Sequence, residues 1–99
     1  MKSGNKISCS NPNTGSVIKI DASIYNIFEK AILAALKKSQ PMTYGEMIKA
    51  VHKQFEENKT VFDKSVKWYG VTVKNDLQSR GLIQVWMDKG RKMHGLVER

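Results

Sequence analysis

Seven polar side chains in the C-terminal half of the sequence have types and spacings suited to contact with a nucleic acid. They lie in a predicted third helix and in the hairpin after it: Lys67, Lys74, Asn75 and Gln78, then Lys89, Arg91 and Lys92. Lysine and arginine bind backbone phosphates, whereas asparagine and glutamine pair with adenine in a major groove. The pattern predicts a DNA-binding surface. The alternative is an ordinary solvated helix face beside a polar hairpin tip.

Residues suited to metal binding or covalent catalysis are sparse. His52 and His94 are far apart, and neither has a cysteine or an acidic cluster beside it, so we expect no metal and no cofactor. Cys9 is the only cysteine, which excludes an internal disulfide. The sequence contains no phosphate-cradling glycine loop, serine-nucleophile motif or metalloprotease motif. We therefore expect no enzymatic activity and no small-molecule substrate.

The charge balance favours a polyanionic partner. Among 99 residues, 17 Lys and Arg oppose nine Asp and Glu, which gives a formal net charge of +8. Such a field attracts DNA, RNA or anionic lipid, although a basic composition also serves solubility alone. No apolar run approaches the ~20 residues that span a bilayer, so we expect no membrane partner. Residues 1–10 lack the apolar stretch of a signal peptide, and we expect a cytoplasmic protein.

Hydrophobic periodicity predicts the elements that position the polar set. The expected order is a helix from Asp21 or Ser23 to about Lys38, a helix from Thr43 to about Glu57, a helix from residues 63–65 to Gly81, and strands over 82–87 and 91–97. Thr43 and Glu46 have the spacing of a capping box. Centring the inner face of the third helix on Val73 brings Val66 and Leu77 to the same side. Lys74 and its polar neighbours then fall on the outer face.

The first 21 residues form a separate extension. Turn-forming residues at 11–15 precede a β-branched run ending at Asp21, and this run predicts a strand, which can pair with Lys6–Ser10 as a hairpin. We expect this strand to cover Trp68, because an isolated exposed tryptophan is uncommon. Trp86 is expected to pack on the helices or at a dimer contact.

The order helix, capped helix, helix, hairpin resembles the winged-helix variant of helix-turn-helix proteins. The resemblance covers residues 22–99 and rests on the segment 73–83, VKNDLQSRGLI, which is similar to the end of a recognition helix entering its wing. It implies an α+β fold. Two features differ from DNA-binding members: a longer link at 58–64 and the bulky pair Trp68-Tyr69. Neither favours base reading.

A narrower resemblance is to a family of small bacterial proteins of unknown function. The positions that carry it are Asn11-Pro12, Asp21, Tyr25, Thr43 with Glu46, Trp68-Tyr69 and the run Val73–Leu77. This resemblance accounts for the N-terminal extension but implies no activity and no binding residues.

The sequence therefore predicts a winged-helix protein that binds duplex DNA, in the manner of a transcription regulator. Binding would be electrostatic first and sequence-reading second. One alternative is a protein-interaction module, or a homodimer, that uses Trp68 and Trp86 as aromatic anchors. RNA binding shares the charge argument.

Overall fold

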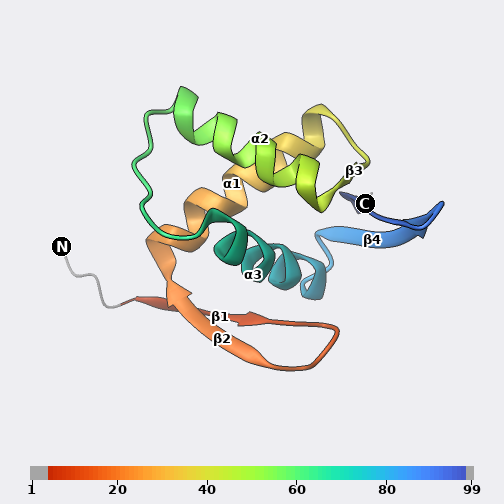
Figure 1. Ribbon diagram of the computed structural model, residues 1–99. Helices are drawn as coiled ribbons and strands as arrows, with labels where there is room; N and C mark the ends of the chain where they lie inside the picture. Colours follow the sequence, from red (N-terminus) through yellow and green to blue (C-terminus); the bar gives the residue numbers. More distant parts are fainter. Residues whose placement is uncertain (1–4, 98–99) are drawn as a thin grey trace.

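A computed structural model describes residues 5–97 of the chain, which have an α+β architecture of three helices and two small antiparallel sheets (Figure 1). The elements in chain order are β1 (Lys6–Ser10), β2 (Val17–Asp21), α1 (Ala22–Lys38), β3 (Met42–Thr43), α2 (Tyr44–Glu57), α3 (Val66–Ser79), β4 (Ile83–Asp88) and β5 (Arg91–Leu96). The predicted helices and strands are present, with boundaries shifted by a few residues. The short strand β3 was not predicted.

The starts of α1 and α2 are stabilised differently. Thr43 and Glu46 form the predicted capping box, in which each side chain accepts a hydrogen bond from the other residue's backbone N–H. Asp21 occupies the N-cap position of α1 but makes no side-chain capping bond. Its carboxylate instead lies 3.0 Å from the Lys6 ammonium across the β1–β2 pair. Of the two predicted starts of this helix, Asp21 and Ser23, the structure has Asp21, without a side-chain cap.

The hydrophobic core lies between the three helices and is completed by buried residues of the strands, namely Cys9, Ile20, Met42 and Ile83. Phe28 of α1 is at its centre and meets the rings of Phe55 and Phe62 edge to face, with centroids 5.2 and 5.1 Å apart. Val73 and Leu77 of α3 are fully buried, as the predicted helix phase required. The inner stripe of α3 was thus predicted correctly.

The second sheet has the strand order β3-β5-β4. Lys89 and Gly90 connect β4 to β5 and both have positive φ, 52° and 80°, as a tight type I′ hairpin requires. Because side chains alternate along a strand, Lys92 and His94 of β5 lie on one side of this sheet. Arg91 and Met93 lie on the other side, together with Trp86, which pairs with Met93.

The N-terminal hairpin β1–β2 runs beside α3, as Figure 1 shows (red and orange strands next to the teal helix). The strands pair with Ile7 opposite Ile20 and Cys9 opposite Ile18, which confirms the predicted hairpin. Cys9 and Ile20 point inward and are buried. The hairpin does not cover Trp68, whose side chain is 45% exposed, so that expectation was wrong.

Trp86 packs its ring over Gly95, where an added Cβ would lie 3.0 Å from the indole, and remains 39% exposed. Its expected packing on the helices is therefore replaced by packing within the sheet.

Within residues 5–97, no helix combines the length and apolarity that crossing a bilayer needs.

Candidate functional site

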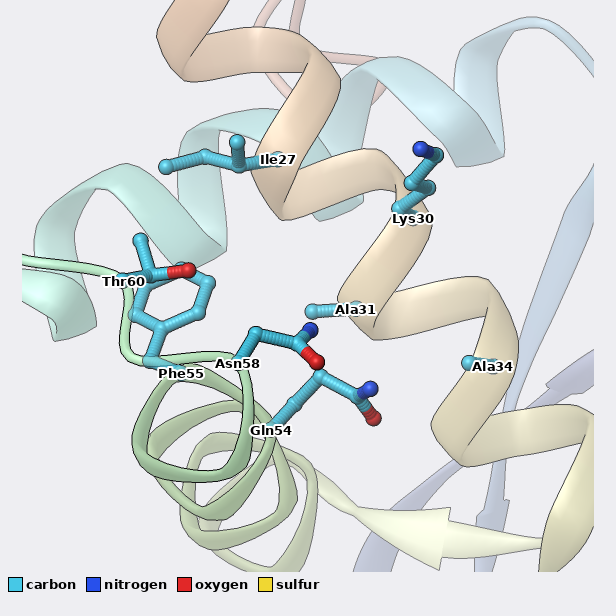
Figure 2. Close-up of a pocket in the computed structure, with 8 residues that line it drawn as sticks. All are labelled: Ile27, Lys30, Ala31, Ala34, Gln54, Phe55, Asn58 and Thr60. Carbon is cyan, nitrogen blue, oxygen red and sulfur yellow. The ribbon is translucent and has the colours of Figure 1, made fainter.

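A cavity of about 260 Å³ lies between α1 and the C-terminal half of α2 (Figure 2). Its walls are Ile27, Lys30, Ala31, Ala34, Gln54, Phe55, Asn58 and Thr60. Figure 2 shows the amides of Gln54 and Asn58 projecting between the two helices. The lining contains no histidine, cysteine or carboxylate, so it offers no typical metal ligand, and its one titratable side chain is Lys30. The residues that could do chemistry lie elsewhere.

The structure separates the predicted DNA-binding residues into three environments. Four are exposed, namely Lys67, Lys89, Arg91 and Lys92, two are partly buried, namely Asn75 and Gln78, and Lys74 is buried. Lys74 is only 5% exposed. Its predicted place on the outer, solvated face of α3 was therefore wrong.

The outer face of α3 is narrower than the periodicity indicated because both of its flanks are covered. The β1–β2 hairpin covers the flank of Thr72 and Asp76, and both of these residues are buried. The Asn75 Oδ1 atom is also buried, next to a small cavity of about 40 Å³ under the hairpin, and has no hydrogen-bond partner there. The opposite flank, with Lys74, faces β5 and the start of α2.

The basic hairpin β4–β5 presents its cations in different directions. Lys92 shares the side of His94, which faces α3. Arg91 is on the other side of the sheet, near Glu46. The hydrogen bond from the Thr43 backbone is the main cause that lowers the pKa of the Glu46 carboxyl, and the charge of Arg91 makes a smaller contribution. The three cations therefore do not form one continuous patch with α3. Lys67 and Lys92 remain exposed beside the part of the α3 surface that no other element covers.

Lys74, Tyr44 and His94 converge from α3, α2 and β5. The Lys74 Nζ atom lies 6.0 Å from the centroid of the Tyr44 ring, and the Tyr44 and His94 ring centroids are 6.4 Å apart. Burial, with a smaller contribution from Lys92, lowers the pKa of Lys74 to about 8. Burial also raises the pKa of Tyr44 to about 12. Displaced pKa values gathered at one place mark candidate functional sites.

His94 is fully buried and is held in one tautomer. Its Nδ1 lies 3.0 Å from the Met42 carbonyl oxygen, which can only accept, so Nδ1 is the protonated nitrogen. Burial, together with Lys74 and Lys92, lowers the pKa of His94. The imidazole is therefore neutral near pH 7. Its Nε2 atom is a bare acceptor, buried and without a partner among the described residues.

A groove opens beside this cluster. It has a volume of about 190 Å³ and is lined by Asn13, Gln78, Val85, Trp86, Met87 and Lys92. Gln78 lies one helical turn beyond Lys74 on the same flank of α3. The groove thus lies between the N-terminal turn and the β4–β5 hairpin and opens the Lys92 side of the cluster to solvent, whereas Lys74 and His94 do not line it.

A second buried polar cluster is centred on Asp76, which is 4% exposed. Its carboxylate accepts hydrogen bonds from the Ser10 backbone N–H at 3.0 Å and from the Tyr25 hydroxyl at 2.6 Å. Arg80 Nε lies 3.2 Å from the same carboxylate, and Arg80 also pairs with Glu29. The groups satisfy one another, so this cluster joins β1, α1 and α3 mechanically.

Neither cysteine chemistry nor metal binding has a clear place in residues 5–97. Burial raises the pKa of Cys9 to about 11, so its reactive thiolate is scarce at neutral pH. No three His, Cys, Asp or Glu side chains gather within this part of the chain.

The comparisons with known proteins identify a family but no activity. Residues 6–93 match the model of the family described as "Family of unknown function (DUF6958)". The chain belongs to this family. No curated protein and no solved structure gave a significant match. Membership of DUF6958 agrees with the resemblance to a family of unknown function, and the match includes the N-terminal hairpin, Tyr44 and Lys74 and ends one residue before His94.

In this member of DUF6958, the sequence-based interpretation missed Tyr44 and His94 as partners of Lys74. One signal was available for His94: in a strand, it shares a side with the basic residue Lys92 two positions earlier. No comparable signal existed for Tyr44. Its proximity to Lys74 depends on Gly70, where an added Cβ would lie 3.0 Å from the Tyr44 hydroxyl.

Proposed function

We propose that this protein is a winged-helix protein that binds duplex DNA, chiefly through backbone phosphates. The binding surface consists of the exposed strip of α3 and the β4–β5 hairpin as its wing. The observation that carries the proposal is a set of unpaired cations at this surface. Within residues 5–97, the cations of the ion pairs are Lys6 and Arg80, so Lys67, Lys89 and Lys92 have no anionic partner.

The arrangement of the elements supports the winged-helix interpretation. Three helices precede a two-stranded hairpin, and β4 follows the end of α3 directly (Figure 1). The short strand β3, just before α2, pairs with β5 and completes a three-stranded sheet. In winged-helix proteins, the helix before the wing and the wing itself are the usual contact elements.

The covered flanks of α3 favour phosphate contact over base reading. Asn75, which was expected to read adenine, has its Oδ1 buried against the N-terminal hairpin. Gln78 is still accessible in the groove. One amide cannot specify a site, because several base contacts are needed to distinguish a sequence. We therefore expect binding with little sequence preference.

The salt dependence of binding to a random DNA duplex tests this proposal. If about four phosphates are contacted, the logarithm of the association constant should fall with log salt at a slope near −4. Replacing Lys89, Arg91 and Lys92 together with alanine should remove up to about three units of that slope and weaken binding at least tenfold at low salt. Fluorescence anisotropy over a salt series measures both quantities.

A matched control removes the same charge elsewhere. Lys30, Lys38 and Lys53 line the cavities between α1 and α2, away from the hairpin. Replacing all three with alanine removes three positive charges, as the hairpin variant does, so the two variants have the same net charge. It should keep most of the slope. Equal losses in both variants would place the binding surface elsewhere, and no binding at tens of micromolar protein in low salt would contradict the proposed function.

Protein interaction is the second candidate, favoured by the exposed Trp86 and Met87. Trp86 lies on the side of the β4–β5 hairpin away from His94, and Trp68 lies on α3, so the two tryptophans do not form one anchor. Self-association through Trp86 would appear in sedimentation as a mass that rises with concentration and that Trp86→Ser abolishes. A monomer at all concentrations would exclude the homodimer.

A further inference from the structure

The Lys74 ammonium is a buried charge without a counter-ion among the described residues. It is 5% exposed, forms no ion pair and makes no hydrogen bond, and its Nζ atom lies 6.0 Å from the centroid of the Tyr44 ring. Burying an unpaired charge is unfavourable. A ring face compensates only part of that penalty.

The carboxylates on neighbouring elements are engaged elsewhere. Asp76 of α3 is held by Ser10, Tyr25 and Arg80. Glu46 of α2 accepts from the Thr43 N–H at 2.9 Å. No acidic residue contributes to the pKa of Lys74, and the charged neighbour that does contribute is Lys92, another cation. Within residues 5–97, nothing is placed to neutralise this pair.

The buried Nε2 atom of His94 adds an independent observation. It accepts no hydrogen bond from the described part of the chain, and the Nδ1–H bond to the Met42 carbonyl fixes it as an acceptor. The site thus offers two ammonium donors and one imidazole acceptor. An anion that also carries a hydroxyl proton can satisfy all three groups at once.

We propose that Lys74, Lys92 and His94 form a binding site for one phosphate group that carries a titratable proton, either inorganic phosphate or a phosphate monoester. The two ammonium groups donate to its anionic oxygens, and the P–OH proton is shared with His94 Nε2. The groove lined by Gln78 and Lys92 exposes the Lys92 side of this site to solvent, and the ligand would enter from that side. A bridging phosphodiester has no such proton, so it would leave Nε2 without a partner.

This site goes beyond the proposed contact with backbone phosphates, since it selects terminal or free phosphate. The phosphate group has two chemical sources: a small phosphorylated compound or the phosphorylated end of a nucleic acid. Only the second source depends on the proposed function.

The test compares inorganic phosphate with sulfate, which has the same shape but no proton at neutral pH. At pH 7 and constant ionic strength, phosphate should raise the melting temperature of the full chain and bind at least about tenfold more tightly than sulfate, because only phosphate satisfies Nε2. Lys74→Met should lose the phosphate response, and Lys53→Met, on α2, should keep it. Equal responses to phosphate and sulfate, or an undiminished response in Lys74→Met, would overturn the proposal.

NMR of the wild-type protein keeps the test valid if Lys74→Met fails to fold. Phosphate should shift the His94 imidazole nitrogen and Lys74 side-chain resonances, and sulfate should leave the His94 nitrogen unchanged. Absence of both shifts at tens of millimolar phosphate would refute the site.

Two duplexes, with and without 5′-phosphates, distinguish the sources. If the phosphorylated duplex binds more tightly and Lys74→Met loses this difference, the site recognises nucleic-acid ends. If both duplexes bind equally and inorganic phosphate binds, the site recognises small phosphorylated compounds. Duplex binding without any response to phosphate would refute this site and leave the proposed function intact. A phosphate response without duplex binding would support this site and contradict the proposed function.

Discussion

Asp76→Ala is expected to lower the free energy of unfolding by about 2–4 kcal/mol, somewhat below the usual loss for a broken buried ion pair because Arg80 is partly solvated. The carboxylate is the shared acceptor for the Ser10 N–H, the Tyr25 hydroxyl and the Arg80 guanidinium. Removing it leaves the Tyr25 hydroxyl without its acceptor in a buried place. Urea denaturation at pH 7 measures the change.

The same variant should loosen the N-terminal hairpin selectively. Ser10 bonds directly to Asp76, so the amides of β1 should exchange with deuterium faster, whereas those of α2 should change less. Lys6→Ala is the control, since it breaks an ion pair with exposed partners that contributes at most about 1 kcal/mol. An Asp76→Ala midpoint equal to that of the wild type would show that the buried cluster contributes nothing to stability.

Lys74→Met is expected to stabilise the protein by about 3 kcal/mol at pH 7, at ~1.4 kcal/mol per unit of pKa difference. The pKa of Lys74 falls from 10.5 in the unfolded chain to about 8 in the fold, so folding disfavours its charged form. Methionine fills similar space without a charge. Replacing a buried charge by an apolar group of similar volume is often stabilising.

The pH dependence identifies the cause. Below pH 8 both states of the wild type bind the Lys74 proton and the full penalty applies; between pH 8 and 10.5 only the unfolded state binds it, so wild-type stability rises with pH. The advantage of Lys74→Met should therefore shrink across this range and vanish above it. The facing groups Tyr44, Lys92 and His94 are common to both proteins, so their titration largely cancels in the difference.

Denaturation of the two proteins at several pH values gives this difference directly. Lys67→Met, which removes an exposed lysine from the same helix, should show no such pH-dependent advantage. A constant difference between Lys74→Met and the wild type from pH 7 to 10.5 would contradict the depressed pKa of Lys74.

Local sequence signals predicted the helices and strands because those signals are themselves local. The Thr43–Glu46 box, the inward stripe of Val73 and Leu77, and the hairpin turn at Lys89-Gly90 each depend on residues a few positions apart. The pairing of β1 with β2 was also predictable, because one turn connects them. None of these signals states which element covers which.

The exposure of two predicted site residues, Lys74 and Asn75, was mispredicted for that reason. A helical period places Lys74 about a quarter turn from the core centre, at the boundary between covered and solvated positions. Contact with β5 and Tyr44 decides its burial, and both are distant in the sequence. Asn75 was misjudged because the hairpin that hides its oxygen comes from the other end of the chain. The strand β3 has only two residues, which is too short for an alternating hydrophobic pattern to be recognised in the sequence.

The hydrogen bond between Ser10 and Asp76 also has a consequence for the order of folding. It joins residues 66 positions apart, and contacts of such long range form slowly. An isolated two-stranded hairpin is at best marginally stable in water. During synthesis, the N-terminal hairpin therefore lacks its docking surface on α3 until α3 has left the ribosome. The first described residues to be translated are consequently among the last to become fixed in place.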